Sequence, residues 1–150
     1  MAGSPQSGVP QVRNTVFRKM THVYSVRVYY EDTDMAGIVY HANYLKFMER
    51  ARSAWVREMG IDQNQMRQRG LFFAVRHIDA DFLIPAAFDD QLNVCTDVQS
   101  VSGARLILNQ SVMRADEKIF SAAVTLALVG ADGKPTRMPE AIQKNAIKWL

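Results

Sequence analysis

The feature that most constrains the fold of this chain is one long helical pattern that is followed almost entirely by strand patterns. Between Asn43 and Gly60, apolar residues recur at the three- and four-residue spacing of a helix with one buried face. We expect Asn43 to cap this helix and Gly60 to end it. The apolar stripe consists of Tyr44, Phe47, Met48, Ala51, Trp55 and Met59. A stripe of this width needs a large apolar surface to cover it.

Strand patterns supply that surface. One strand pattern, 22–30, precedes the helix, and a short polar helix or turn, 62–69, follows it. Alternating apolar residues then mark four strands in series, at 72–84, 92–98, 104–112 and 120–128. The residues from Pro139 to the end have helical composition. One helix with successive antiparallel strands predicts an α+β fold, and the edges and outer face of so small a sheet favour a homo-oligomer.

Length and composition predict one domain. Residues 1–20 are rich in Gly, Ser, Pro and Gln and lack periodicity, so we expect a flexible tail ahead of a domain at 21–150. The single cysteine, Cys95, cannot form an internal disulfide, which favours a reducing, cytoplasmic location. The net charge of +3 is mild and the basic residues are scattered, so we expect no nucleic-acid partner.

The sequence lacks the motifs of several common enzyme classes. It contains no G-x-S-x-G elbow, P-loop, G-x-G-x-x-G, H-E-x-x-H or C-x-x-C. The histidines, His22, His41 and His77, do not have metal-ligand spacing, and we predict neither a metal nor a cofactor. Carboxylate chemistry remains, and Asp34 is its best candidate. An aspartate ahead of a helix also often forms an Asx-turn, so both interpretations of Asp34 stay open.

The stretch from Tyr30 to Arg52 contains the motifs E-D-T-D, V-Y-H and E-R-A-R. These residues resemble the signature of hotdog-fold acyl-CoA thioesterases of the 4-hydroxybenzoyl-CoA thioesterase-like family. Within it, they are most similar to the Tol–Pal-associated acyl-CoA thioesterase subfamily. The resemblance implies a curved antiparallel sheet wrapped around one long helix, acyl-CoA as the substrate, and a dimer or dimer of dimers. It also implies a peripheral link to the cell-envelope Tol–Pal system.

The resemblance also assigns roles to individual positions of this sequence. The family's catalytic aspartate falls on Asp34 and its histidine on His41. Backbone amides around Tyr40 and His41 would donate to the oxyanion. Glu49 matches the family's acidic position within the helix, and Arg105 lies where relatives place a basic residue for the phosphates of coenzyme A. The other two acids of the motif, at positions 31 and 32, are expected to shape the loop.

The chemistry of a thioester suits these residue types. Its thiol leaving group has a pKa of about 8.5 and departs as thiolate with little acid help. Asp34 could attack the carbonyl directly or deprotonate a water, and the sequence leaves both open. The helix N-terminus supplies unpaired N–H groups for the oxyanion. Gly37 would turn the loop sharply and bring the backbone close to the ligand, and Tyr44 would contribute one edge of the acyl-chain wall.

Three alternatives remain open at this stage. Glu49 either lines the acyl pocket or pairs with Arg52, three residues further on. His41 either acts on the substrate or packs near the helix start. The chain as a whole could hydrolyse acyl groups on acyl-carrier protein instead of coenzyme A, or bind acyl-CoA as a non-catalytic hotdog scaffold.

Overall fold

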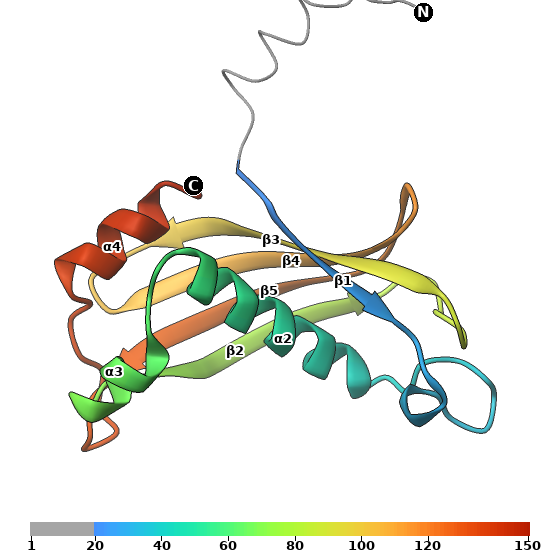
Figure 1. Cartoon of the computed structure of the whole chain (residues 1–150), viewed down its shortest axis with the longest axis horizontal. Coiled ribbons are helices and arrows are strands. Elements are labelled where there is room, and N and C mark those ends of the chain that lie inside the picture. Colours follow the sequence, from blue (N-terminus) through green and yellow to red (C-terminus); the bar gives the residue numbers. More distant parts are fainter. Residues whose placement is uncertain (1–19) are drawn as a thin grey trace, which may run out of the picture.

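The computed structural model describes residues 20–150, so the predicted tail, apart from Met20, lies outside the described residues. Five strands form one antiparallel sheet in the order β1-β3-β4-β5-β2, and the long helix α2 lies along one face of it (Figure 1). The elements in chain order are β1 (His22–Arg27), the short 3₁₀ helix η1 (Tyr30–Asp32), α2 (Asn43–Glu58), α3 (Gln63–Gln68), β2 (Phe72–Phe82), β3 (Gln91–Val101), β4 (Arg105–Arg114), β5 (Glu117–Val129) and α4 (Glu140–Ile147).

The core lies between α2 and the sheet. Phe47 and Trp55 on α2 are 1% and 0% exposed, and they face alternate apolar residues of the strands. Strands β3 and β4 contribute buried residues at every second position, because successive side chains of a strand point to opposite faces. Burying a large apolar side chain contributes about 1.5–3 kcal/mol. The predicted α+β arrangement, a curved antiparallel sheet around one long helix, is confirmed.

The two ends of α2 differ in how well they were predicted. Gly60 has a φ of +80° and follows the C-cap residue Met59, which confirms the predicted end. The predicted cap at the start is wrong. Ala42 occupies the N-cap position, and Asn43 is the first helical residue. The side chain of Asn43 does not cap the helix, because its Nδ2 donates to the carbonyl of Asp32, 2.9 Å away.

Strand β1 ends at Arg27, three residues before the predicted end. The reason lies in Asp32, whose Oδ2 accepts a hydrogen bond from the backbone N–H of Tyr29 at 2.9 Å. This contact closes η1 and turns the chain out of the sheet. The other strands and the short helix α3 begin and end within about three residues of the predicted positions. Among residues 20–150, no helix is long and apolar enough to cross a membrane.

One buried polar residue joins the sheet to α2. Gln110 of β4 is 1% exposed, and its Nε2 donates to the carbonyl of Met48 at 3.1 Å and to Oγ1 of Thr96 at 3.0 Å. Its Oε1 accepts from Nη1 of Arg52 at 3.1 Å. Gln110 therefore satisfies polar groups on both layers of the fold. Burial lowers the pKa of Arg52, and the charge of Glu49 acts in the opposite direction.

We expect Phe47→Ala to lower the free energy of unfolding by about 3–5 kcal/mol, because it leaves a cavity between α2 and the sheet. Arg50→Ala, on the exposed side of the same helix, is the matched control and should change stability by less than about 0.5 kcal/mol. Urea titration followed by circular dichroism measures both values. Equal stabilities of the two variants would contradict the assignment of the buried face.

Candidate active site

The loop before α2 is a tight hairpin. Thr33 and Val39 form an antiparallel bridge, and the N–H of Asp34 donates to the carbonyl of Ile38 at 2.9 Å. Gly37 closes the turn by donating to the carbonyl of Asp34 at 3.0 Å. Its φ of +81° lies in the left-handed region, which a residue with a Cβ enters only at a cost. The sharp turn predicted at Gly37 is confirmed.

The carboxylate of Asp34 is exposed, and one of its oxygens accepts a hydrogen bond. Oδ1 accepts a hydrogen bond from the N–H of Ala36 at 2.9 Å, which is an Asx-turn. Within residues 20–150, no donor bonds to Oδ2. One oxygen therefore orients the carboxylate while the other is available to an electrophilic carbon or a water. The Asx-turn and the catalytic interpretation are compatible in this geometry.

Asp32, by contrast, is used by the loop itself. Its carboxylate accepts from Tyr29, and its carbonyl accepts from both the N–H of Tyr40 and the Nδ2 of Asn43, each at 2.9 Å. These bonds tie η1 to the end of the hairpin and to the first turn of α2. One of them also occupies the N–H of Tyr40, a predicted oxyanion donor, which donates to Asp32 instead.

Two other amides at the helix start have no such bond. In the part of the chain that the structure describes, the N–H groups of His41 and Ala42 donate to no acceptor. The carbonyls of the same two residues accept from Tyr44 and Leu45, at 3.3 and 3.2 Å, so the turn that opens α2 is formed. Unpaired N–H groups at a helix N-terminus carry a partial positive charge. This end of α2 is therefore suited to stabilising an anion.

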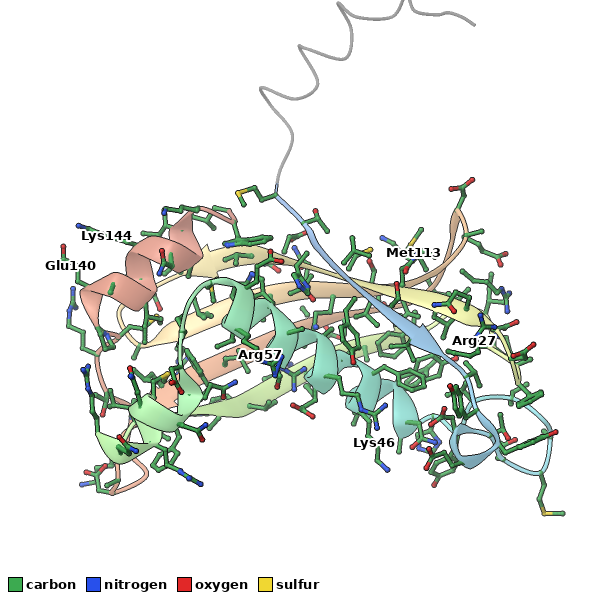
Figure 2. The ribbon with its side chains drawn as sticks, in the orientation of Figure 1. Arg27, Lys46, Arg57, Met113, Glu140 and Lys144 are labelled. Carbon is green, nitrogen blue, oxygen red and sulfur yellow. The ribbon has the colours of Figure 1, made fainter. Side chains whose placement is uncertain are left out.

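Asp34 and the helix start share one open hollow of about 720 Å³. Tyr40, Ala42 and Lys46 also line it. Lys46 projects from α2 near the hairpin (Figure 2). Lys46 is not among the predicted site residues, although its spacing of four residues from Ala42 places both on one side of the helix. The hollow thus combines a carboxylate, a positively polarised helix end and an ammonium group.

Of the aromatic residues behind the hollow, Tyr44 is packed in the core, whereas His41 and Phe82 are exposed. Tyr44 is 4% exposed, its ring stacks on Phe120 with a centroid distance of 4.8 Å, and its hydroxyl accepts from the N–H of Ala86 at 3.2 Å. Burial raises the pKa of Tyr44, although the bond from Ala86 acts in the opposite direction. Phe82 is 54% exposed. Its ring lies edge-on to the ring of Tyr44 and to the exposed ring of His41, with centroid distances of 5.7 and 6.2 Å.

Glu49 and Arg105 lie away from the hollow within one chain. Glu49 is further along α2, and its Oε2 accepts from Oγ of Ser53 at 2.6 Å. Within residues 20–150 it forms no ion pair with Arg52, whose guanidinium bonds to β4 instead. Arg105 begins the ten-residue strand β4, whereas the residue that contacts the loops near Asp34 is Arg114 at its other end. A rise of about 3.3 Å per residue separates these ends by about 30 Å.

Residues 20–150 contain no group of three His, Cys, Asp or Glu side chains arranged to hold a metal ion. The hollow itself is lined by Asp34, by Ala42 at the start of α2 and by the side chain of Lys46.

Comparisons with known proteins show that this chain is similar to thioesterases. Residues 28–146 match the model of the thioesterase-like superfamily. An acyl-CoA thioesterase, YbgC, of Haemophilus influenzae is 38% identical over 122 residues, which cover 80% of this chain and 90% of that protein. The acyl-CoA thioester hydrolase YbgC of Escherichia coli is 35% identical over 134 residues, covering 87% of this chain and 96% of that protein.

A solved structure, a probable thioesterase from Bartonella henselae, has a TM-score of 0.77 and 37% identity to this chain. The match covers 80% of this chain and 100% of that one. The resemblance to hotdog-fold thioesterases, first drawn from residues 30–52, is confirmed by these matches over most of the chain. The chain belongs to the thioesterase-like superfamily.

Proposed function

We propose that this chain hydrolyses acyl-coenzyme A to a free acid and coenzyme A, with Asp34 as the catalytic carboxylate. The observation that carries the proposal is that Asp34 lines the same hollow as the N-terminal end of α2. Hydrolysis of a thioester needs a nucleophile or base beside a group that stabilises negative charge on the carbonyl oxygen. Relatives at 35–38% identity that are named as acyl-CoA thioesterases support this assignment.

The reaction can be written with the residues of the hollow. In one route, Oδ2 of Asp34 attacks the carbonyl carbon, the C–S bond breaks, the thiolate of coenzyme A leaves, and water hydrolyses the mixed anhydride. In the other route, Asp34 takes a proton from a water that attacks the same carbon. In both routes the carbonyl oxygen becomes negative. Because Asp32 engages the amide of Tyr40, we assign the oxyanion to the N–H groups of His41 and Ala42.

The remaining side chains have supporting roles in this proposal. The exposed ring of His41 and the neighbouring Phe82 form the wall that the acyl group meets. Tyr44 holds that wall from the core, and Gly37 lets the hairpin approach the ligand closely. Lys46 supplies a positive charge beside the hollow, where an anionic coenzyme A substrate enters.

Strand β2 supports the proposal of a homo-oligomer. It forms one edge of the sheet, and exposed apolar residues lie on and beside it, namely Phe72, Val75, Phe82 and Leu83. An unpaired apolar edge strand favours pairing with another strand, and a second copy offers the same edge.

Antiparallel pairing of two β2 strands would also bring Arg105 closer to the site. Arg105 pairs with Ala127 of β5, which pairs with Ala74 near the start of β2. In an antiparallel pair, the start of the partner's β2 lies beside the end of the first β2, at Phe82. Arg105 of the partner subunit would then be the residue that approaches coenzyme A. Glu49 of the first subunit would face the partner subunit. The cytoplasmic location and the Tol–Pal link stay predictions from the sequence.

The first test is Asp34→Asn. We expect kcat to fall by about 10²–10⁴-fold with propionyl-, palmitoyl- and benzoyl-CoA, because the amide can act neither as a base nor as a nucleophile. The matched control is Glu31→Gln, which removes an acidic charge from the same hollow and should retain turnover. Release of free thiol measures both. Near-normal turnover by Asp34→Asn would overturn the mechanism, and saturable binding without turnover by the wild type would favour a binding scaffold.

The second test removes one amide. Ala42 has a φ of −67°, close to the value of about −65° that proline requires, so Ala42→Pro deletes the N–H with the φ of this residue preserved. We expect a fall of about 10²–10³-fold in kcat, as for the loss of an oxyanion donor. Ala42→Gly keeps the amide and is the control. Circular dichroism checks the fold of both variants, and an Ala42→Pro enzyme that folds and turns over like Ala42→Gly would exclude this amide as a donor.

The third test concerns assembly. Light scattering should give the wild type a mass of at least twice that of the 16.9 kDa chain. Val75→Asp places a charge on the edge strand β2 and should shift the mass towards that of one chain. Val23→Asp is the control, because Val23 is also exposed, at 55%, but belongs to β1 at the opposite edge. A wild type that is monomeric at micromolar concentration contradicts the proposed assembly.

A further inference from the structure

We propose that Arg114, the last residue of β4, is a positioning residue for the Asp34 site. It fixes the segment 83–90 between β2 and β3, and that segment holds the hairpin of Asp34 and the start of α2. This inference rests on the proposed function of Asp34. Arg114 does not line the hollow, so it acts through the backbone that it fixes rather than on the substrate.

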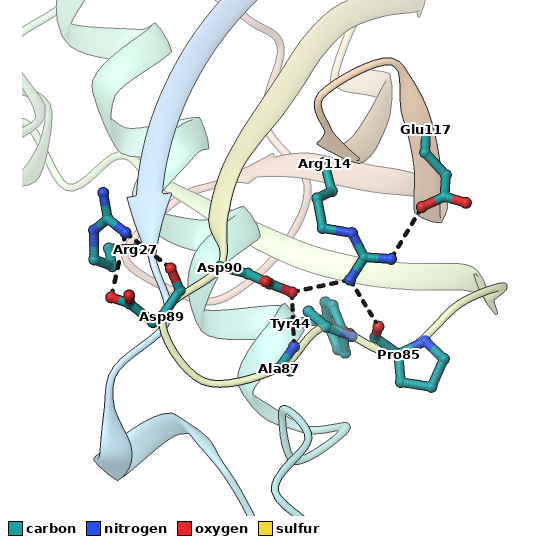
Figure 3. A network of polar contacts seen from close by, with 9 residues as sticks. Arg27, Tyr44, Pro85, Ala87, Asp89, Asp90, Arg114 and Glu117 are labelled. Atoms are coloured by element: carbon teal, nitrogen blue, oxygen red, sulfur yellow. Dashed lines mark hydrogen bonds and ion pairs between the residues drawn. The ribbon is translucent and has the colours of Figure 1, made fainter.

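Arg114 joins three points of the chain (Figure 3). Its Nη1 donates to Oδ2 of Asp90 at 2.9 Å and to the carbonyl of Pro85 at 3.2 Å, and its Nη2 donates to Oε1 of Glu117 at 2.9 Å. The side chains of Arg114 and Asp90 are only 31% and 25% exposed, so this pair is less screened by solvent than a surface pair. A planar guanidinium with several bonds fixes direction as well as distance.

Asp90 transmits this contact into the segment. Its Oδ2 also accepts the N–H of Ala87 at 2.9 Å, and its own N–H donates to the carbonyl of Ala87 at 3.1 Å. Burial acts to raise the pKa of Asp90, but the bonds from Ala87 and Arg114 and the charge of Arg114 outweigh it and lower the pKa. The carboxylate is therefore held in its charged form, and Arg114 and Asp90 together clamp the segment at Pro85 and Ala87.

The clamped segment is bonded directly to the site. The carbonyl of Ala86 accepts the N–H of Val39 at 2.8 Å, and Ile38 forms an antiparallel bridge with Ala87. Val39 is the first residue of the V-Y-H motif, and the carbonyl of Ile38 accepts the N–H of Asp34. Ala86 is 0% exposed and donates its own N–H to Tyr44 in the first turn of α2. A shift of Ala86 would therefore move both the catalytic carboxylate and the oxyanion donors.

A second arginine contacts the same segment and provides a matched control. Nη1 of Arg27 donates to the carbonyl and Oδ1 of Asp89, at 2.8 and 3.3 Å. These two side chains are 47% and 69% exposed, and neither bonds to Pro85, Ala86 or Ala87. Loss of Arg27 therefore removes the same charge as loss of Arg114, together with the contact to Asp89. It leaves Ala86 and Ala87, which pair with the hairpin, in place.

The test compares Arg114→Gln, Arg114→Lys, Asp90→Asn and Arg27→Gln in the full chain, with the acyl-CoA substrate that the wild type turns over fastest. We expect Arg114→Gln to lower kcat about tenfold or more with KM changed less than about threefold, since misplacement by about 1 Å can cost about 10²-fold in rate. Arg114→Lys keeps the charge but not the planar fork and should recover part of the loss. Arg27→Gln should remain within about twofold of the wild type.

Amide hydrogen exchange provides a readout that does not depend on activity. In Arg114→Gln, the N–H of Val39 should lose protection while the amides of the central strand β4 keep theirs. If kcat of a folded Arg114→Gln stays within about twofold of the wild type, or if protection falls equally throughout the sheet, the inference is wrong. If Arg114→Gln does not fold, the same measurements of kcat and amide exchange on Asp90→Asn test the inference. An active Asp34→Asn would instead overturn the proposed function, so the two failures are distinguishable.

Discussion

The burial of one face of α2 against the sheet is the constraint on which the site depends. Phe47 and Trp55 are almost completely enclosed, and they fix both the rotation of α2 and its position along the sheet. A helix is stiff and rises about 1.5 Å per residue, so fixing its middle also fixes its first turn. The unpaired amides of His41 and Ala42 are placed in this way by the core. Only the carboxylate has to be brought to them by a loop.

In this loop, the hydrogen-bond donors around an acidic side chain, rather than its residue type, decide whether it shapes the backbone or is available to a substrate. Asp32 and Asp34 are two residues apart in the same motif and carry the same group. The carboxylate and carbonyl of Asp32 accept bonds from three donors, so Asp32 shapes the backbone. Asp34 accepts one bond on Oδ1 from its own turn, and among the described residues its other oxygen has no donor. A carboxylate oriented on one side and unbonded on the other is the arrangement that a nucleophile or general base requires.

The sequence was sufficient for the fold but for only part of the site. Helical and strand periodicity record which face of each element is apolar, and those faces are what α2 and the sheet bury. Asn43, Gln110 and Arg114 escaped the same reasoning because their roles depend on contacts that no local pattern encodes. Asn43 bonds to a carbonyl in the preceding loop, and Gln110 is a polar residue at a position where alternation predicts an apolar one. Arg114 meets Asp90, which is distant in sequence and adjacent only once β3, β4 and β5 have paired.

The hairpin of Asp34 is held from two sides, by α2 through Asn43 and by the segment 83–90 through Ala86. Tyr44 joins these two supports, because it belongs to the first turn of α2 and its hydroxyl accepts the N–H of Ala86. A phenylalanine would fill the same apolar space against Phe120 but would leave a buried N–H without an acceptor, which costs about 1–3 kcal/mol. A buried tyrosine at this position is therefore explained by the N–H that it satisfies. Because both supports meet at this residue, the carboxylate and the helix amides are positioned by one connected set of bonds.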